Sequence, residues 1–214
     1  MEVTRCRSDL LFSNMYLLTE KGHSLVIDPF EHYVPAKNFM PDLMLITHEH
    51  YDHISGVNRM KEKYGIMLMC SADCAQKIEN PRTNAARYFD AFCELQTYGE
   101  QDMSVTINKD YCCYADLTFE DEIRFKWREN ELWLFTLPGH SAGGIGIVVN
   151  NEIFFSGDSL FLNVETELRF PGGNKKAWQE ISVKRLNQLS ENLCVYPGHR
   201  EKFMLKERKR NGSI

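Results

Sequence analysis

Short apolar runs bounded by turn residues characterise the first 50 residues of the chain. The apolar run at residues 10–18, the turn at 20–22 and the run at 24–27 predict a β-hairpin, because strands of this length bounded by turn residues pair locally. A further apolar run at residues 42–47 follows a proline and ends in a histidine-rich stretch. Its length and composition predict a buried strand.

The next segment alternates between helical and strand-like patterns. Apolar side chains recur at helical spacing over residues 55–64, which end at a glycine, and a strand-like run covers residues 66–70. Residues 71–78 predict a helix with Ser71 as its N-cap. The order of strand, helix, strand and helix favours a mixed or parallel α/β sheet.

Three strands in the second half each run into a glycine followed by a polar residue. The predicted strands cover residues 131–137, 152–155 and 193–196. The polar residues that follow them are His140, Asp158 and His199. An amphipathic helix is predicted over residues 177–189. Residues 80–120 are less regular: the pattern is helical near residues 87–92 and strand-like at 105–107 and 111–119.

Composition places the chain among folded proteins. It has 214 residues, of which 43% are hydrophobic and 26% are charged, which favours one domain over residues 1–205 and a basic, disordered tail over 206–214. The net charge of -5 disfavours nucleic acid as a partner. No apolar stretch approaches the length of a membrane span and no signal peptide is recognised, so a cytoplasmic protein is expected. Seven cysteines without CxxC spacing predict reduced thiols.

Five of the seven histidines occur at predicted strand ends, three of them in the segment Thr-His-Glu-His-Tyr-Asp-His. On an extended chain, residues two apart face the same way, so His48 and His50 can bind one ion. The turn after them lets Asp52 and His53 bind a second ion beside the first. Imidazole and carboxylate ligands suit zinc, iron and manganese.

Each motif alone has an ordinary structural explanation as a turn or a cap. Their occurrence at four predicted strand ends favours a metal site, because the structural explanation would have to apply independently four times. Asp158 is the natural bridging carboxylate, since a shared anionic ligand offsets the repulsion between two neighbouring cations.

These segments resemble the metallo-β-lactamase fold hydrolases, and among them the glyoxalase II-like (hydroxyacylglutathione hydrolase-like) branch. The resemblance is carried by SNMYLL, VIDP, THEHYDHISG, LPGHSAGGIGIVV, FFSGDSLF, PGG and VYPGH. It implies an α/β fold, the αβ/βα four-layer sandwich, with a dinuclear metal site at one edge of two sheets. It also implies the ligands: His48, His50 and His140 for the first metal, Asp52, His53 and His199 for the second, and Asp158 between them.

Departures from the family narrow the expected activity. Lactam-cleaving members with two zincs carry a cysteine at the position of Asp158, and diiron flavoproteins carry a glutamate at the position of His50. Glyoxalase II enzymes hold glutathione with a helical C-terminal extension, whereas fifteen residues follow His199 here, so a glutathione thioester is not the expected substrate. Nucleases of the fold add clamp domains and basic surfaces.

The sequence therefore predicts a metal-dependent hydrolase of a small ester, thioester or lactone. Two divalent ions, with zinc ahead of iron or manganese, would activate a bridging hydroxide, and Asp52 would orient it as the catalytic residue. A mononuclear iron oxygenase resembling persulfide dioxygenases, a phosphodiesterase and a non-catalytic sensor are the alternatives. The expected partner is a small molecule, no membrane association is expected, nucleic acid is a disfavoured partner, and the oligomeric state is left open.

Several further residues have weaker expectations. His23 and His32 are predicted as exposed turn residues, and Glu49 is predicted to face away from the pocket. Phe161 and Phe170 are candidates for the pocket wall. Candidates for contacts behind the ligands are Thr47, Ser141 and Ser156.

Overall fold

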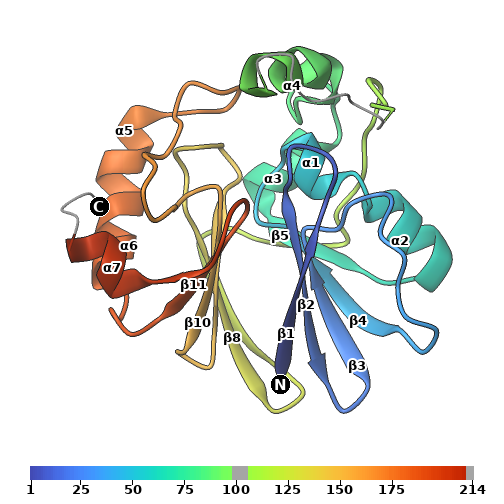
Figure 1. Ribbon diagram of the computed structural model, residues 1–214, viewed down its shortest axis with the longest axis horizontal. Coiled ribbons are helices and arrows are strands. Elements are labelled where there is room, and N and C mark those ends of the chain that lie inside the picture. The colour runs from blue at the N-terminus through green and yellow to red at the C-terminus, as the bar shows by residue number, and fades with distance from the viewer. Residues whose placement is uncertain (98–105, 211–214) are drawn as a thin grey trace.

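The strands form two facing sheets in the computed structural model, which describes residues 1–97 and 106–210 (Figure 1). The first sheet has, in spatial order, β1 (Glu2–Arg7), β2 (Asn14–Glu20), β3 (His23–Ile27), β4 (Met40–Leu45), β5 (Leu68–Ser71) and β6 (Leu117–Phe119). Strands β1 to β3 are antiparallel, and β3 to β6 are parallel. The predicted hairpin is confirmed as β2 and β3.

The second sheet is mostly antiparallel. Its strands are β7 (Glu122–Trp127), β8 (Asn130–Thr136), β9 (Ile145–Val149), β10 (Ile153–Gly157), β11 (Cys194–Pro197) and β12 (Phe203–Met204), arranged in sequence order. Only β10 and β11 pair in parallel among the described strands of this sheet. His140, Asp158 and His199 therefore follow β8, β10 and β11, in line with the predicted strands.

Helices cover the outer faces of both sheets (Figure 1). Those in the half of the chain that builds the first sheet are α1 (Tyr51–Ile54), α2 (Val57–Tyr64), α3 (Ala72–Ile78), η1 (Ala86–Tyr88) and α4 (Phe89–Thr97), of which α4 lies above the ends of the strands in Figure 1. Those on the side of the second sheet are α5 (Lys175–Ala177), the π-helical turn η2 (Trp178–Ser182), α6 (Val183–Gln188) and α7 (Leu205–Arg210). Ser71 caps α3 as predicted, since its Oγ accepts a hydrogen bond from the Cys74 amide at 3.1 Å.

Buried strands supply side chains to two different layers of core. In β2, Met15 and Leu17 pack among the helices, whereas Tyr16 and Leu18 pack between the two sheets. Side chains of β9 divide in the same way between the inter-sheet layer and the layer against the C-terminal helices. A strand buried on both faces must be apolar at nearly every position, which explains the continuous apolar runs. The predicted four-layer sandwich is confirmed.

The chain departs from the predicted strands between residues 105 and 119. Residue 105 lies outside the described residues, and 106 and 107 are irregular. Of residues 111–119 only Leu117–Phe119 form a strand. Upstream, the Cys113 amide donates to the Ile78 carbonyl at 3.1 Å and Asn84 donates to the Tyr111 carbonyl at 2.9 Å. The end of α3 and the segment that follows it therefore take hydrogen bonds that a strand would need.

The C-terminal region also differs from the sequence-based expectation. The helix expected at residues 177–189 begins at Lys175 and contains a π-helical turn. The disordered tail expected at residues 206–214 instead begins as helix α7, because Leu205 and Arg208 are buried against the second sheet's helical layer. Residues 211–214 lie outside the described part of the chain.

No disulfide bond joins two cysteines of the described residues. Among the described residues, every helix is too short or too polar to cross a membrane.

Candidate metal centre

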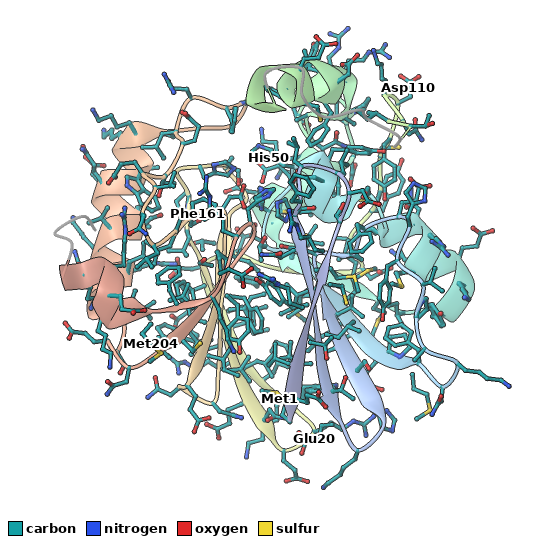
Figure 2. All side chains as sticks on the ribbon, in the orientation of Figure 1. Met1, Glu20, His50, Asp110, Phe161 and Met204 are labelled. Carbon is teal, nitrogen blue, oxygen red and sulfur yellow. The ribbon has the colours of Figure 1, made fainter. Side chains whose placement is uncertain are left out.

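The seven predicted ligands meet at one edge of the sandwich, where strands of both sheets end. His48 and His50 follow β4, and Asp52 and His53 lie in α1. The other three follow strands of the second sheet: His140, Asp158 and His199. Figure 2 shows His50 at this edge, between the two sheets. Both halves of the chain therefore contribute to one cluster.

The potential ligand atoms form three overlapping groups. In each group, the atoms lie no more than 4.8 Å from one another. The groups are His48 with His50 and His140, His48 with His53 and Asp158, and Asp52 with His53 and His199. Oδ2 of Asp52 lies 3.3 Å from His53 Nε2 and 3.2 Å from His199 Nε2. The first and third groups are thus two compact sets of three donors.

Asp158 lies between these two sets. Its Oδ2 is 3.6 Å from Nε2 of His140 and 3.5 Å from Nε2 of His199, and its Oδ1 is 3.5 Å from Nε2 of His53. The chain must approach closely here: a Cβ on Gly198 would lie 2.2 Å from Oδ1 of Asp158. Only glycine leaves room for this carboxylate between the sets.

In each imidazole of the first set, the ring nitrogen that points away from the cluster lies next to an oxygen. Nε2 of His50 donates to the Pro171 carbonyl at 3.2 Å, and Nδ1 of His140 donates to the Glu167 carbonyl at 2.8 Å. Nδ1 of His48 lies 3.1 Å from Oγ1 of Thr47. A carbonyl can only accept, and the Thr47 hydroxyl already donates to Asp28, so these rings carry their proton on the outward nitrogen and the inward nitrogen of the neutral ring is an acceptor.

The two imidazoles of the second set are held in the same way. Nδ1 of His199 donates to the Leu11 carbonyl at 3.0 Å, and Nδ1 of His53 donates to Oδ2 of Asp28 at 3.1 Å. Asp28 is buried and also accepts hydrogen bonds from the amide and the hydroxyl of Thr47, both at 2.6 Å. One carboxylate therefore orients His53 directly and His48 through Thr47.

The inward atoms lack partners that would satisfy them. Nε2 of His48, Nε2 of His53 and Oδ1 of Asp158 are buried without a hydrogen bond. Nε2 of His140 lies 3.1 Å from Nδ1 of His50. Because both neutral rings carry their proton on the outward nitrogen, each of these two atoms presents a lone pair to the other. A buried polar atom without a partner is costly, and facing lone pairs repel. A cation bound by the inward atoms satisfies both requirements, so the donor set fits divalent metal ions.

Electrostatics distinguish the two sets. Burial lowers the pKa of His140 to about 4 and holds the pKa of His48 well below its usual value, and neighbouring imidazoles add to this effect. Both rings are therefore neutral near pH 7, the form in which imidazole binds metals.

In the second set carboxylates dominate. Burial alone would lower the pKa of His53, but the charges of Asp52 and Asp158 outweigh it and raise the pKa to about 9. The same two carboxylates raise the pKa of His199 despite its burial. A cation that binds to the second set therefore has to displace protons from His53 and His199, whereas the imidazoles His48 and His140 of the first set are already neutral.

Glu49 lies between the ligands His48 and His50 in sequence and faces away from them, as predicted. It is fully buried, and its carboxylate accepts hydrogen bonds from the amides of Ala142 and Gly143 at 3.1 Å each. These amides belong to the loop that carries His140. Glu49 thus ties the loop after β4 to the loop after β8.

Other expectations have mixed outcomes. His32 is exposed, whereas His23 is half-buried and lies 2.8 Å from Asp42, away from the centre. Ser156 bonds only the carbonyls of its own turn, and Oγ of Ser141 has no hydrogen bond among the described residues.

Sequence reasoning missed the roles of Asp28 and Glu49. The position of Asp28, directly after a buried strand beside β4, was the signal that could have found it.

A cavity of about 770 Å³ opens above the centre. His50, Asp52, His140, Asp158 and His199 form part of its wall. Phe161 and Phe170 line it as expected, and Phe89 and Phe92 extend the apolar wall. The cavity is large enough for a small organic molecule and lies directly against the predicted ligands.

Comparison with known proteins supports the resemblance. Residues 8–73 match the metallo-beta-lactamase superfamily. The chain is 27% identical over 207 residues to the hydroxyacylglutathione hydrolase of Pelagibacter ubique, covering 93% of this chain and 70% of the relative.

Solved structures give the same fold over nearly the whole chain. The B3 metallo-beta-lactamase BLEG-1 superposes with a TM-score of 0.79 at 20% identity, covering 98% of this chain and 97% of the other. TTHA1623, solved in a di-iron-bound form, superposes with a TM-score of 0.75 at 24% identity, covering 97% of each chain. The metallo-β-lactamase fold and the resemblance to the glyoxalase II-like branch are confirmed, and the likenesses support the predicted class, a metal-dependent hydrolase.

Proposed function

We propose that this chain, which has the metallo-β-lactamase fold, is a hydrolase with two divalent metal ions that cleaves a small ester, thioester or lactone. The observation that carries the proposal is the arrangement of five imidazoles, each with its outward nitrogen next to an oxygen and its inward nitrogen turned towards a cluster that contains the carboxylates of Asp52 and Asp158. In this arrangement Nε2 of His48, Nε2 of His53 and Oδ1 of Asp158 have no hydrogen bond, and bound cations would satisfy them.

The proposed ligands follow the two compact sets. His48, His50 and His140 would hold the first ion, Asp52, His53 and His199 the second, and Asp158 would contact both. Zinc is the proposed metal because imidazole and carboxylate donors at this spacing suit it, with iron as the alternative that the di-iron form of TTHA1623 supports.

When bound, the ions would supply an activated water, polarise the substrate carbonyl at the first set and neutralise the leaving anion at the second. The chain's own residues do the rest. Asp52 faces the cavity and is placed to accept a hydrogen bond from the attacking water and so orient it. Thr47, Asp28 and the three backbone carbonyls fix the imidazole rings, so that the donor geometry needs little reorganisation when substrate binds.

The cavity supports a small substrate. Its volume of about 770 Å³ and its aromatic wall fit a molecule with an apolar group better than a polymer. We place the protein as a small-molecule enzyme in the cytoplasm, and its acidic net charge disfavours nucleic acid as a substrate.

The test combines metal analysis with a substrate panel. Protein purified without oxygen is expected to contain two zinc ions per chain and to hydrolyse at least one ester, thioester or lactone. His48→Ala is expected to lose an ion and reduce kcat/KM by a thousandfold or more, whereas His32→Ala at an exposed histidine is expected to change neither.

A single iron per chain with oxygen-dependent turnover would contradict the hydrolase and favour the iron oxygenase. Two bound ions with cleavage of phosphodiesters alone would favour the phosphodiesterase. A protein with two ions that turns over no member of the panel would favour the non-catalytic sensor.

A further inference from the structure

The cavity above the metal centre has an aromatic wall on the side of the first ligand set. The Phe170 ring lies with its centroid 6.2 Å from that of His50 and 5.8 Å from that of His140, and Phe92 packs against Phe170 at 5.3 Å. Phe89 continues this wall at 6.5 Å from Phe92. A substrate group on this side meets the apolar surface of these rings beyond the ligands.

The wall on the side of the second set is basic. Arg200 directly follows the ligand His199, and Arg5 and Arg7 of the edge strand β1 line the same part of the cavity. The guanidinium of Arg7 lies 4.1 Å from the centroid of the Phe12 ring, which also lines the cavity. Stacking on a ring leaves the guanidinium N–H groups free to bind an anion.

The acidic side chains of the wall outside the metal centre do not neutralise this basic surface. Each of them pairs with an arginine: Glu165 with Arg208 at 3.3 Å, Glu167 with Arg169 at 2.6 Å and Glu201 with Arg5 at 2.8 Å. Arg7 and Arg200 form no ion pair with any residue in the described ranges 1–97 and 106–210. Two guanidinium groups of the cavity wall thus lack a close ion pair with the described residues in a chain of net charge -5.

The backbone of Arg200 is held in an unusual conformation. Its φ of +70° is in the left-handed region, which is unfavourable for a residue with a side chain. Its carbonyl accepts hydrogen bonds at 2.9 Å from Asn14 Nδ2 and from Arg5 Nη1. Strain of this kind persists where the surroundings enforce it, and it is concentrated at functional sites.

We propose that the substrate has a leaving group that carries a carboxylate or a phosphate, which Arg7 and Arg200 bind, and an apolar acyl group that packs against Phe92 and Phe170. This rests on the hydrolase function proposed above and specifies its substrate class. The orientation follows from the walls: the aromatic wall contacts the set whose ion would polarise the carbonyl, and the arginines lie beside the set whose ion would neutralise the leaving anion. Guanidinium groups bind carboxylate and phosphate oxygens through paired hydrogen bonds.

The test uses three thioesters with one apolar acyl group and leaving thiols that end in a carboxylate, a phosphate or a neutral carboxamide. The wild type is expected to show a kcat/KM at least tenfold higher for one or both anionic thioesters than for the neutral one. The higher of the two identifies the anion. In the double variant Arg7→Gln, Arg200→Gln this ratio is expected to fall to within threefold of one, and Arg200→Lys is expected to retain part of it.

Arg124→Gln is the matched control. Arg124 stacks on Trp133 at 4.2 Å, as Arg7 does on Phe12, but lies on β7 and does not line the cavity. This variant is expected to leave the ratio and the activity unchanged. Equal kcat/KM values for all three thioesters in the wild type would overturn the inference while leaving the hydrolase function in place.

Binding supplies a readout that does not need turnover. Amide analogues of the three thioesters are titrated into the zinc-loaded protein by calorimetry, and the anionic ones are expected to bind at least tenfold more tightly, with the difference lost in the double variant. If this arginine-dependent difference is found and no thioester is hydrolysed, anion binding stands and the hydrolase function falls. If the amides bind equally, the inference falls regardless of activity.

Discussion

Individual residues behind the ligands decide how the metal centre is held. Asp28 orients two imidazoles, and Glu49 is a fully buried carboxylate that bonds two amides of the His140 loop. No lysine or arginine of the described residues pairs with Glu49. Hydrogen bonds from backbone amides to a carboxylate are stronger than those to a neutral acceptor. Removing the Glu49 carboxylate should therefore destabilise the His140 loop more than removing a neutral acceptor would.

Glu49→Gln tests this role. A glutamine keeps one acceptor but turns an NH₂ group towards backbone N–H groups, so we expect the zinc affinity to fall by tenfold to a hundredfold, the range typical of partners behind metal ligands. The measurement is competition for zinc with a chelator. Glu62→Gln, on the exposed face of α2, is expected to keep the wild-type affinity. An unchanged affinity in Glu49→Gln would mean that the loop is held without this carboxylate.

At the scale of elements, the loop between β8 and β9 is fixed by its contacts with α3 and with the loop after β4. The Ser71 hydroxyl donates to the Gly143 carbonyl at 2.8 Å, and the Ile145 amide donates to the Thr47 carbonyl at 2.8 Å. A Cβ on Gly143 would lie 2.4 Å from Cα of Cys74. The N-terminal end of α3 therefore supports the loop that carries His140.

Gly143→Ala is expected to push this loop away from α3. The clash is with backbone atoms, so we expect a loss of about 2–3 kcal/mol in the free energy of unfolding, the upper range for overpacking, and a lowered kcat. Gly65→Ala is the control: its φ of +63° costs about 1–2 kcal/mol, but the space around it is open. Urea unfolding and kinetics on the best panel substrate measure both. Full activity in Gly143→Ala would show that the His140 loop tolerates the displacement.

The ligand-bearing strands could be predicted because each is an apolar run that ends at a polar residue beside glycine or a turn. Strands β1 and β7 could not, since edge strands with one exposed face alternate with charged residues and lack that signal. The partners of the imidazoles were also beyond prediction. The carbonyls of Leu11, Glu167 and Pro171 have no side-chain signature, and they reach the centre only through contacts between residues 27 to 188 positions apart.

Across the whole molecule, polar contacts link the two sheets at the end opposite the metal centre. Asp42, near the start of β4, accepts hydrogen bonds from Nε1 of Trp127 at 2.9 Å and from Arg128 at 2.8 Å, and lies 2.8 Å from Nδ1 of His23. Burial raises the pKa of Asp42, but the hydrogen bonds from His23, Trp127 and Arg128 outweigh it and lower the pKa below its usual value.

Because the folded-state pKa is lowered, the ionised Asp42 stabilises the protein above the unfolded-state pKa, near 3.8, and this contribution is lost as the pH falls through the lower folded-state value. Asp42→Asn is therefore expected to lose about 1–2 kcal/mol of the free energy of unfolding at pH 7, and the difference from wild type should shrink below about pH 4. Urea unfolding from pH 7 to pH 3 measures it. Asp9→Asn, at an exposed carboxylate without an ion pair among the described residues, is the control. A difference independent of pH would exclude a role for the charge.

Four of the proposed ligands belong to the half of the chain that builds the first sheet, and three to the half that builds the second. The number of ions bound at the centre therefore indicates whether the two halves are correctly positioned relative to each other. If the two halves moved apart by about an ångström or two at the metal centre, the coordination bonds would break. The hydrogen bonds between the strands within each half would still be intact at that point. Ion release should thus be an early event in unfolding, and reloading the ions should be a late step in assembly, after both halves have docked.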